Sequence, residues 1–354
     1  MRSPPLTPDD DRVTHHSVPI GIHVYHYIQS LPASPDKPRG TILLLHGWPD
    51  TAMSWRHQVP FLTSPPLNLR VVAPDMLGYG KTSSPADPAE YSLKKMSMHM
   101  QALVKHVVDQ DNEPGDKPAP LFLVGHDWGA ALAWRMAALW TPGLFRGVAC
   151  LNVPYLPPDA GEFVDMQAYV DEIPSLRYQV QLSGDEAVSI IDDASDNHAN
   201  LRGFLNGIYD GRGPNGEESF TVDEGVRQPE VLRVVGPAKL MGEDWVDYYV
   251  KQFAARSFRG PTNWYRTRKI NYEEETGMHD VVINTPAMVV MGEQDEALPP
   301  ALADGMEKWF AEGLLRKEVV PGGHWAHWEE VDRVNTLLGE FLRGVLGGYS
   351  PNRG

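Results

Sequence analysis

The strongest constraint on the fold of this chain is the pentapeptide Gly125-His126-Asp127-Trp128-Gly129 together with its flanks. A short apolar run, Leu121–Val124, precedes it, and residues 130–139, which are rich in helix formers, follow it. Glycines on either side of one functional residue permit a tight strand-to-helix turn that projects the middle side chain above a sheet. The pattern therefore predicts a strand, a sharp turn at Asp127 and a helix, as in a parallel α/β sheet.

Short apolar segments on both sides of this unit predict the rest of the sheet. They lie at His23–Gln29, Thr41–Leu45, Leu69–Ala73, Val148–Leu151, Ala287–Met291 and Arg316–Val320. Helical patterns at Tyr91–Val108 and at about 330–345 alternate with them, so we expect an α/β fold with a mostly parallel sheet flanked by helices on both faces. Residues 1–20, rich in Pro and Asp, are expected to lie loosely on the surface.

The alternation of short apolar segments with helical patterns stops between about Pro154 and Gly277. This stretch holds helical patterns, loops such as residues 210–216 and many aromatic side chains. The simplest account is a helical cap, or lid, inserted into one α/β domain. We expect the core domain at residues 1–153 and 278–354 and the cap at residues 154–277.

Charge and composition exclude several kinds of partner. A net charge of −16 argues against binding to nucleic acid or to an anionic membrane, because both need a basic surface. No apolar stretch is long enough to span a bilayer, and the first residues lack a signal-peptide core. The single cysteine, Cys150, excludes internal disulfides and a cysteine-based metal site. We therefore expect a cytoplasmic protein without nucleic-acid or membrane partners, and the oligomeric state stays open.

An aspartate at the tip of such a turn has a specific chemical meaning. Its carboxylate is ionised at neutral pH and needs no base to act as a nucleophile. It can displace a leaving group at an sp³ carbon and form an ester, which points to epoxides or alkyl halides as substrates. The motif alone is weak, because an Asp beside Gly is commonly a solvated turn residue. The strand before Asp127, the helix after it and its partners elsewhere favour the nucleophile.

Two further ionisable residues follow strands whose carboxyl ends should meet Asp127. Asp295 comes after the strand at 287–291 through the turn 292–294, and His324 comes after the strand ending at Val320 through Pro321-Gly322-Gly323. In open α/β sheets the chemistry lies outside these strand ends, and the chain order is nucleophile, acid, histidine. An imidazole oriented by a buried carboxylate is a general base. The sequence thus predicts Asp127 as nucleophile, Asp295 as acid and His324 as base.

Each of these assignments has a competitor in the sequence. His327 lies one helical turn beyond His324 and is expected to pack at the start of the last helix, while the glycines before His324 favour it as the base. Glutamates flank Asp295 and read as surface charges. Asn152, after the preceding strand, occupies the alternative place for the acid in some enzymes with an Asp nucleophile. An amide, however, cannot stabilise an imidazolium by charge.

A second loop is expected to complete the site. His46-Gly47-Trp48-Pro49 follows the apolar strand that ends at Leu45. The backbone N–H groups of Trp48 and Trp128 are candidates for an oxyanion hole that serves the hydrolysis of the ester. Pro49 has no N–H and cannot be a donor.

Taken together, these motifs resemble the soluble epoxide hydrolases of the α/β-hydrolase fold. The matching segments are His46–Pro49, Asp75–Gly80, Gly125–Gly129 and Gly323–Trp325, and the resemblance extends over about residues 20–345. Each motif by itself is shared with dehalogenases, but the set is specific. The resemblance implies an enzyme, an ether-bond hydrolase that opens an epoxide to a vicinal diol through an ester on Asp127. It implies neither a metal nor an organic cofactor.

The resemblance also implies residues that the pattern alone does not single out. Two cap tyrosines, Tyr178 in Arg177-Tyr178-Gln179 and Tyr265 in the segment 259–266, would donate hydrogen bonds to the epoxide oxygen. The implied substrate is a small apolar epoxide, which the cap would shield from water. We expect Trp128, Phe163 and Leu182 to line its pocket together with the tyrosines.

Three other functions compete with this interpretation. A haloalkane-type dehalogenase would use the same Asp nucleophile, and Trp128 has an indole N–H that can donate to a halide. A non-catalytic ligand receptor on the same fold would be expected to carry a damaged triad, and every position here is intact. A serine esterase is excluded because the chain contains no Gly-x-Ser-x-Gly.

Overall fold

The computed structural model describes residues 4–34, 37–110 and 119–348. Contacts between residues divide the chain into two compact units. The first, here called the core unit, contains Met1–Met76, Ser92–Gly161 and Asn271–Gly354, and the second, the smaller unit, contains Leu77–Tyr91 and Glu162–Ile270. The core and cap bounds expected from the sequence stay a prediction; they differ from these units chiefly at Leu77–Tyr91, which the sequence analysis assigned to the core.

The core unit is built around an eight-stranded sheet with the order β1-β2-β4-β3-β5-β6-β9-β10. Its strands are β1 (Thr14–Ile20), β2 (His23–Ser30), β3 (Thr41–Leu45), β4 (Arg70–Pro74), β5 (Leu121–His126), β6 (Gly147–Leu151), β9 (Ala287–Gly292) and β10 (Leu315–Val320). The six strands from β4 to β10 in this order run parallel to one another, whereas β2 is antiparallel to both β1 and β4. This sheet confirms the predicted α/β fold class.

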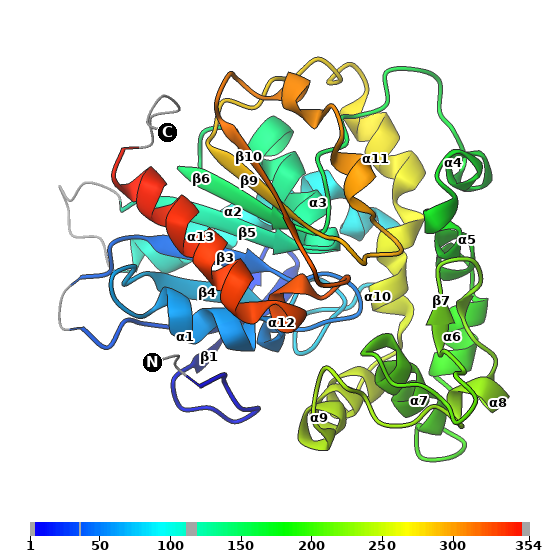
Figure 1. The fold of residues 1–354 in the computed structure, drawn as a ribbon. Coiled ribbons are helices and arrows are strands. Elements are labelled where there is room, and N and C mark those ends of the chain that lie inside the picture. The colour runs from blue at the N-terminus through cyan, green and yellow to red at the C-terminus, as the bar shows by residue number, and fades with distance from the viewer. Residues whose placement is uncertain (1–3, 35–36, 111–118, 349–354) are drawn as a thin grey trace. The chain divides into compact units, whose positions relative to one another are not determined.

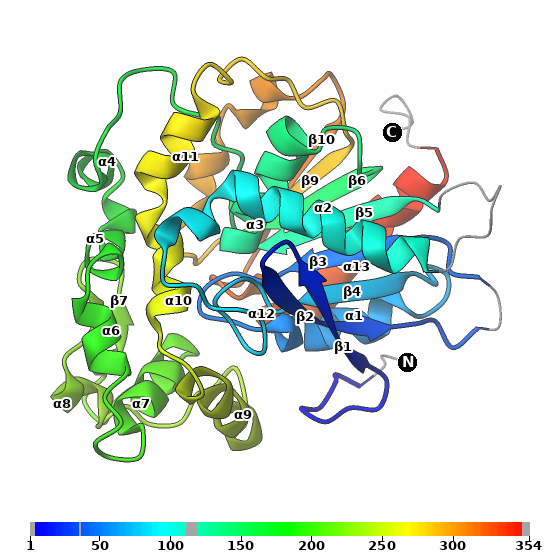
Figure 2. The ribbon, with the colours of Figure 1, turned by 180° about the vertical axis from the view of Figure 1, so that it is seen from behind.

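The central strands are apolar because both of their faces are covered. Every residue of β3, β4, β6 and β9 is buried. Figure 1 shows α1 (Gln58–Leu62) and α13 (Val331–Leu346) over one face of the sheet. Figure 2 shows α2 (Leu93–Asp109) and α3 (Trp128–Arg135) over the other. Strands buried on both faces read as continuous apolar runs, which is why the sequence pattern located them.

The loose surface segment expected at the N-terminus is wrong for residues 14–20. These residues form β1, which pairs with β2 in register from Thr14 opposite Gln29 to Ile20 opposite His23. Most of β1 is exposed or half-buried, and only Val18 and Ile20 are buried. An edge strand with one partner and little burial carries almost no apolar signal, so backbone pairing rather than side-chain pattern defines it.

The smaller unit is mainly helical. Its helices are α4 (Met166–Glu172), α5 (Tyr178–Ser183), α6 (Glu186–Ile191), α7 (Ala199–Ile208), α8 (Pro229–Leu232), α9 (Glu243–Ala254) and α10 (Arg259–Asn263), and β7 (Phe220–Thr221) pairs antiparallel with β8 (Gly225–Val226). The helix α11 (Arg268–Glu275) contains the boundary between the units, and α12 (Ala326–Glu329) belongs to the core unit. Across the described residues, no helix combines the length and apolarity needed to cross a membrane.

Candidate active site

The turn at Asp127 is held in a strained backbone conformation by its neighbours. β5 ends at His126 and α3 begins at Trp128, so the whole turn consists of Asp127, whose φ is 50° and ψ is −125°. Few residues other than glycine adopt positive φ, and such strain persists where the surroundings fix it. A Cβ on Gly125 would lie 2.6 Å from the Cα of Ala130. The strand and helix therefore approach too closely at this point for any larger residue.

The Asp127 carboxylate is buried and faces groups from two other loops. Its Oδ1 accepts a hydrogen bond of 2.6 Å from the backbone N–H of Trp48. Its Oδ2 lies 3.5 Å from Nε2 of His324. One oxygen thus meets a backbone donor of the predicted oxyanion hole, and the other meets the predicted base.

His324 joins Asp127 to Asp295. Its Nδ1 lies 2.8 Å from Oδ2 of Asp295, and its Nε2 faces Asp127, so each ring nitrogen has a carboxylate partner. The Asp295 side chain is fully buried, whereas 17% of the His324 side chain is exposed. The structure therefore brings Asp127, His324 and Asp295 into one connected array in the core unit, with the imidazole between the carboxylates.

The charges of this array shift the pKa of the imidazole. Burial by itself would lower the pKa of His324, but the negative charges of Asp295 and Asp127 outweigh it and hold that pKa well above its usual 6.5. Burial would likewise raise the pKa of Asp295, but His324, the backbone N–H of Leu298 and the amide of Asn152 outweigh it and lower that pKa. Each partner thus favours the charged form of the other.

Asp295 is oriented by the turn that follows β9. Its Oδ1 accepts backbone N–H groups from Ala297 at 3.0 Å and Leu298 at 2.9 Å, which leaves Oδ2 for the imidazole. The flanking Glu293 and Glu296 are both exposed. Of the acids in this turn, Asp295 is the one whose carboxylate lies beside His324.

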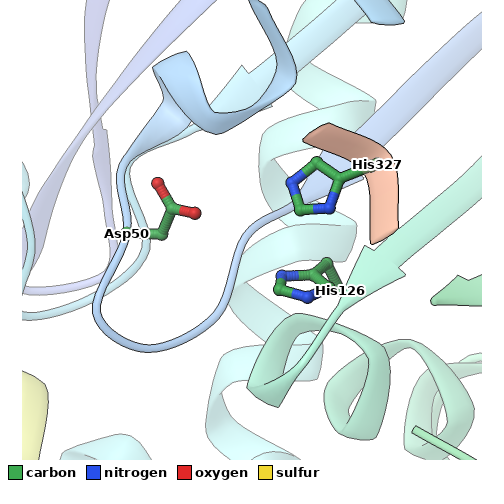
Figure 3. Close-up of side chains that lie close together, drawn as sticks. All are labelled: Asp50, His126 and His327. Atoms are coloured by element: carbon green, nitrogen blue, oxygen red, sulfur yellow. The ribbon is translucent and has the colours of Figure 1, made fainter. Parts of the chain in front are cut away.

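The competing histidine lies in a separate buried cluster, shown in Figure 3 with Asp50 and His126. The Ser54 hydroxyl lies between two members of this cluster, donating to Oδ2 of Asp50 at 2.6 Å and lying 2.9 Å from Nε2 of His327. Burial lowers the pKa of His327 well below its usual value and that of His126 to about 4, so both rings are neutral at pH 7. His327 therefore has neither the carboxylate contact nor the pKa of a base paired with an acid.

Within the part of the chain that the structure describes, Asp50, His126 and His327 are close enough together to hold a metal ion. One ligand atom from each lies within 4.8 Å of the others, and two imidazoles with a carboxylate are ligands that zinc accepts. The Ser54 hydroxyl, however, already joins Asp50 to His327, and His126 Nε2 donates to the backbone oxygen of His324 at 2.7 Å. These bonds make the cluster a polar support for the loop of His324, so we assign no metal to it.

The second predicted oxyanion donor, Trp128, is half-buried at the first position of α3. A Cβ built on Gly47 would lie 2.7 Å from the Trp128 backbone nitrogen and 2.5 Å from the Cβ of Asp127. The loop of Trp48 therefore packs directly against the turn that carries Asp127 and Trp128. Both predicted donors lie at this contact between the two loops.

The remaining predicted site residues lie in the smaller unit. Tyr178 begins α5, and Tyr265 lies in the 3-10 turn Trp264–Arg266. Their rings are edge to face, with centroids 6.0 Å apart, and both side chains are buried. The structure thus brings together two tyrosines that stand far apart in the sequence. Leu182 is fully buried on α5, whereas Phe163 is exposed.

Two polar residues contact the array that sequence reasoning did not assign to it. The Asn152 amide donates to Oδ2 of Asp295 at 2.9 Å and to the backbone oxygen of Gly323 at 3.0 Å. His126 donates to the backbone oxygen of His324. The positions of both, at the ends of β6 and β5, were a usable signal, because carboxyl ends of neighbouring parallel strands meet at one edge of the sheet.

Comparison with known proteins places the chain in a family. Residues 40–331 match the family model described as alpha/beta hydrolase fold. The epoxide hydrolase srdG of Neurospora crassa is 44% identical over 96% of this chain and 98% of that protein. Bifunctional epoxide hydrolase 2 of Rattus norvegicus is 32% identical over 96% of this chain, which spans 57% of that protein.

Solved structures agree on the fold. An epoxide hydrolase of Vigna radiata superposes with a TM-score of 0.76 at 22% identity, covering 94% of this chain and 98% of that one. Potato epoxide hydrolase I, from Solanum tuberosum, gives a TM-score of 0.74 at 23% identity, covering 94% and 99%. With the sheet order, the Asp127 turn and the relative at 44% identity, these matches lead to one conclusion. The chain belongs to the epoxide hydrolases of the α/β-hydrolase fold.

Proposed function

We propose that this protein hydrolyses small apolar epoxides to vicinal diols in two chemical steps. In the first, a carboxylate oxygen of Asp127 attacks a ring carbon of the epoxide, a new C–O bond forms and the strained C–O bond breaks. The opening oxygen takes a proton from Tyr178 or Tyr265, whose phenols hold it by hydrogen bonds. The product of this step is a hydroxyalkyl ester on Asp127.

In the second step, water attacks the carbonyl carbon of this ester while Nε2 of His324 accepts a proton from the water. The backbone N–H groups of Trp48 and Trp128 stabilise the resulting oxyanion. The C–O bond to the carboxyl carbon then breaks, the second proton of the water passes to the departing alkoxide, the diol leaves, and His324 keeps the proton that it took from the water. The Asp127 carboxylate is regenerated, and no other reactant is consumed.

The electrostatics of the site support this order of events. Before the first step, the charges of Asp295 and Asp127 raise the pKa of His324 and keep it protonated. Esterification removes the charge of Asp127, so one of the causes that raise this pKa disappears. The imidazole then loses its proton more readily and passes it to the phenolate that the first step leaves, which restores the phenol. The neutral ring is the base that the second step needs.

A single observation carries the proposal. The buried Asp127 carboxylate has a backbone donor on one oxygen and the His324–Asp295 pair beside the other. The 44% identical relative named as an epoxide hydrolase supports epoxides over alkyl halides as the substrates. The tyrosine pair supports the same choice, because an opening epoxide needs a proton and a departing halide does not.

The test is one turnover of a styrene-type epoxide by excess enzyme in H₂¹⁸O. We expect the label in the Asp127 carboxylate, read by peptide mass spectrometry, and none in the diol, because water attacks the ester carbonyl rather than the epoxide. Label that went straight into the diol would show that no ester forms. A haloalkane turned over faster than styrene-type and fatty-acid epoxides would assign the dehalogenase instead.

A further inference from the structure

Asn152 is the first residue after β6, and the backbone presents it in an unusual conformation. Its φ is 63°, in the left-handed region that Asn tolerates better than most residues. Its own backbone N–H donates to the oxygen of Val290 on the neighbouring β9 at 2.8 Å. The residue is fully buried, so the ends of β6 and β9 fix both its backbone and its surroundings.

Both hydrogens of the Asn152 amide are used, and both go to the catalytic array. One bond reaches Oδ2 of Asp295, the oxygen that also faces Nδ1 of His324. The other reaches the backbone oxygen of Gly323, the residue that precedes His324. Both partners accept hydrogen bonds only, so the amide can face them only through its NH₂ group. One side chain thus ties the acid to the loop that carries the base.

Little room is left for Asp295 or the amide to move. A Cβ on Gly292 would lie 2.9 Å from Nδ2 of Asn152 and 2.7 Å from the backbone oxygen of Gly322. Oδ1 of Asp295 is already held by the backbone N–H groups of Ala297 and Leu298. Besides the imidazole itself, Asn152 is therefore a side-chain donor that fixes the second oxygen of Asp295.

We propose that Asn152 is a positioning residue that aligns Asp295 and the His324 loop for hydrolysis of the ester. The inference rests on the proposed two-step reaction, and it assigns Asn152 to the second step. Asn152 contacts the acid and the loop of the base, so its loss should slow the second step. The first step needs the carboxylate of Asp127, which Trp48 holds independently.

The experiment measures formation and decay of the ester separately, by quenched-flow intact mass on a slow epoxide. The informative variant is Asn152→Gly, because glycine adopts a φ of 63° without strain whereas alanine does not. Asn152→Asp tolerates the same backbone and keeps the size, but it replaces the donor with a second acceptor. It serves as the check if the glycine variant fails to fold.

We expect ester decay to slow about 10- to 100-fold in both variants, as for a misaligned catalytic group, while ester formation stays within about threefold of wild type. The acid limb of the pH profile for ester decay should also move to lower pH in Asn152→Gly. A poorly aligned Asp295 raises the pKa of His324 less, so the imidazole stays deprotonated further into acid. A purely structural role would not move this limb.

Glu329 provides the matched control. Its carboxylate accepts the backbone N–H of Gly323 at 2.7 Å and that of Trp325 at 3.0 Å, so it anchors the same loop without contacting Asp295. Glu329→Gln should leave the pH profile in place. If it reproduces both the slow decay and the shifted limb, Asn152 acts only as a loop anchor and the proposal is overturned.

Two further results would also count against the proposal. Ester decay at the wild-type rate in folded Asn152→Gly would overturn it directly. Equal slowing of ester formation and ester decay would show that Asn152 affects the nucleophile Asp127 and does not act specifically on the second step. Wild-type turnover without any ester would instead refute the proposed function, a failure that the wild-type enzyme alone reveals.

Discussion

Replacing Gly47 by alanine should disable the proposed nucleophile without removing any functional group. The new Cβ would lie 2.5 Å from the Cβ of Asp127 and 2.7 Å from the backbone nitrogen of Trp128, where ordinary contacts begin at 3.4 Å. Relief requires a movement of 3.4 − 2.5, or about 1 Å, and a rotation of the Asp127 carboxylate alone cannot supply it, because one neighbour is its Cβ and another is backbone. A misplacement of about 1 Å in an active site can cost on the order of 100-fold in rate, or about 2.7 kcal/mol of activation free energy.

The assay is the rate of ester formation in a single turnover, measured beside the midpoint of thermal unfolding. Gly161→Ala is the control, since no described heavy atom lies within 4 Å of a Cβ at that position. We expect Gly161→Ala to form the ester at the wild-type rate and Gly47→Ala to form it about 100-fold more slowly. A folded Gly47→Ala enzyme that formed the ester at the wild-type rate would refute the assignment of Asp127 as a nucleophile held by this contact.

Three other changes test the roles of single side chains. His324→Gln should form the ester and fail to hydrolyse it, so that an adduct accumulates and is detected by intact mass. Accumulation in His327→Gln instead would show that His327, and not His324, is the base. Tyr178→Phe and Tyr265→Phe should each slow epoxide opening by somewhat less than the roughly 10²–10³-fold cost of one lost donor, because the other phenol remains, and the double variant should lose far more. A double variant with wild-type rates on epoxides would remove both tyrosines from the mechanism. Burial lowers the pKa of His126 from 6.5 to about 4, so the stability it contributes is complete above pH 6.5 and declines by up to about 3 kcal/mol as the pH falls through 4. Urea unfolding at about pH 7 and about pH 4.5 should therefore show a smaller loss for His126→Asn than for wild type, and an equal loss would mean that His126 is not buried as a neutral ring.

The parts of the fold that were predictable from sequence are those in which burial or close packing requires apolar residues or glycines at regular positions. The central strands are apolar throughout, Gly125 marks a close approach of β5 to α3, and Gly129 marks a close approach of α3 to the end of β3. Strand β1 left no such pattern, because its pairing uses backbone groups and most of its side chains face solvent. The sequence also did not predict that Leu77–Tyr91 belongs to the smaller unit. That assignment depends on close backbone packing, such as that of Gly78 against Gly260.

The residues of the candidate site likewise fall into those that the sequence predicted and those that it did not. Asp127, Asp295 and His324 follow strands with recognisable turns, and strand order alone puts them at one edge of the sheet. The place of Asn152 at the end of a strand indicates no more than a substitute for the acid. Its actual partners, Asp295 and the oxygen of Gly323, lie 143 and 171 residues further along the chain. Which of several polar residues at a strand end donates to which acceptor depends on distances that the sequence does not contain.

The sheet order also has a consequence for how the protein is made. β6 finishes between β5 and β9, but β9 begins at Ala287, long after β6 ends at Leu151. During synthesis, β6 can pair with β5, but its other edge stays unpaired until β9 has left the ribosome. An exposed edge of a wholly apolar strand is a template for aggregation. A nascent chain that terminates before Ala287 would hold the Asp127 turn without Asp295 or His324. Such a product should be insoluble as well as inactive, and chaperone binding should fall once β9 emerges.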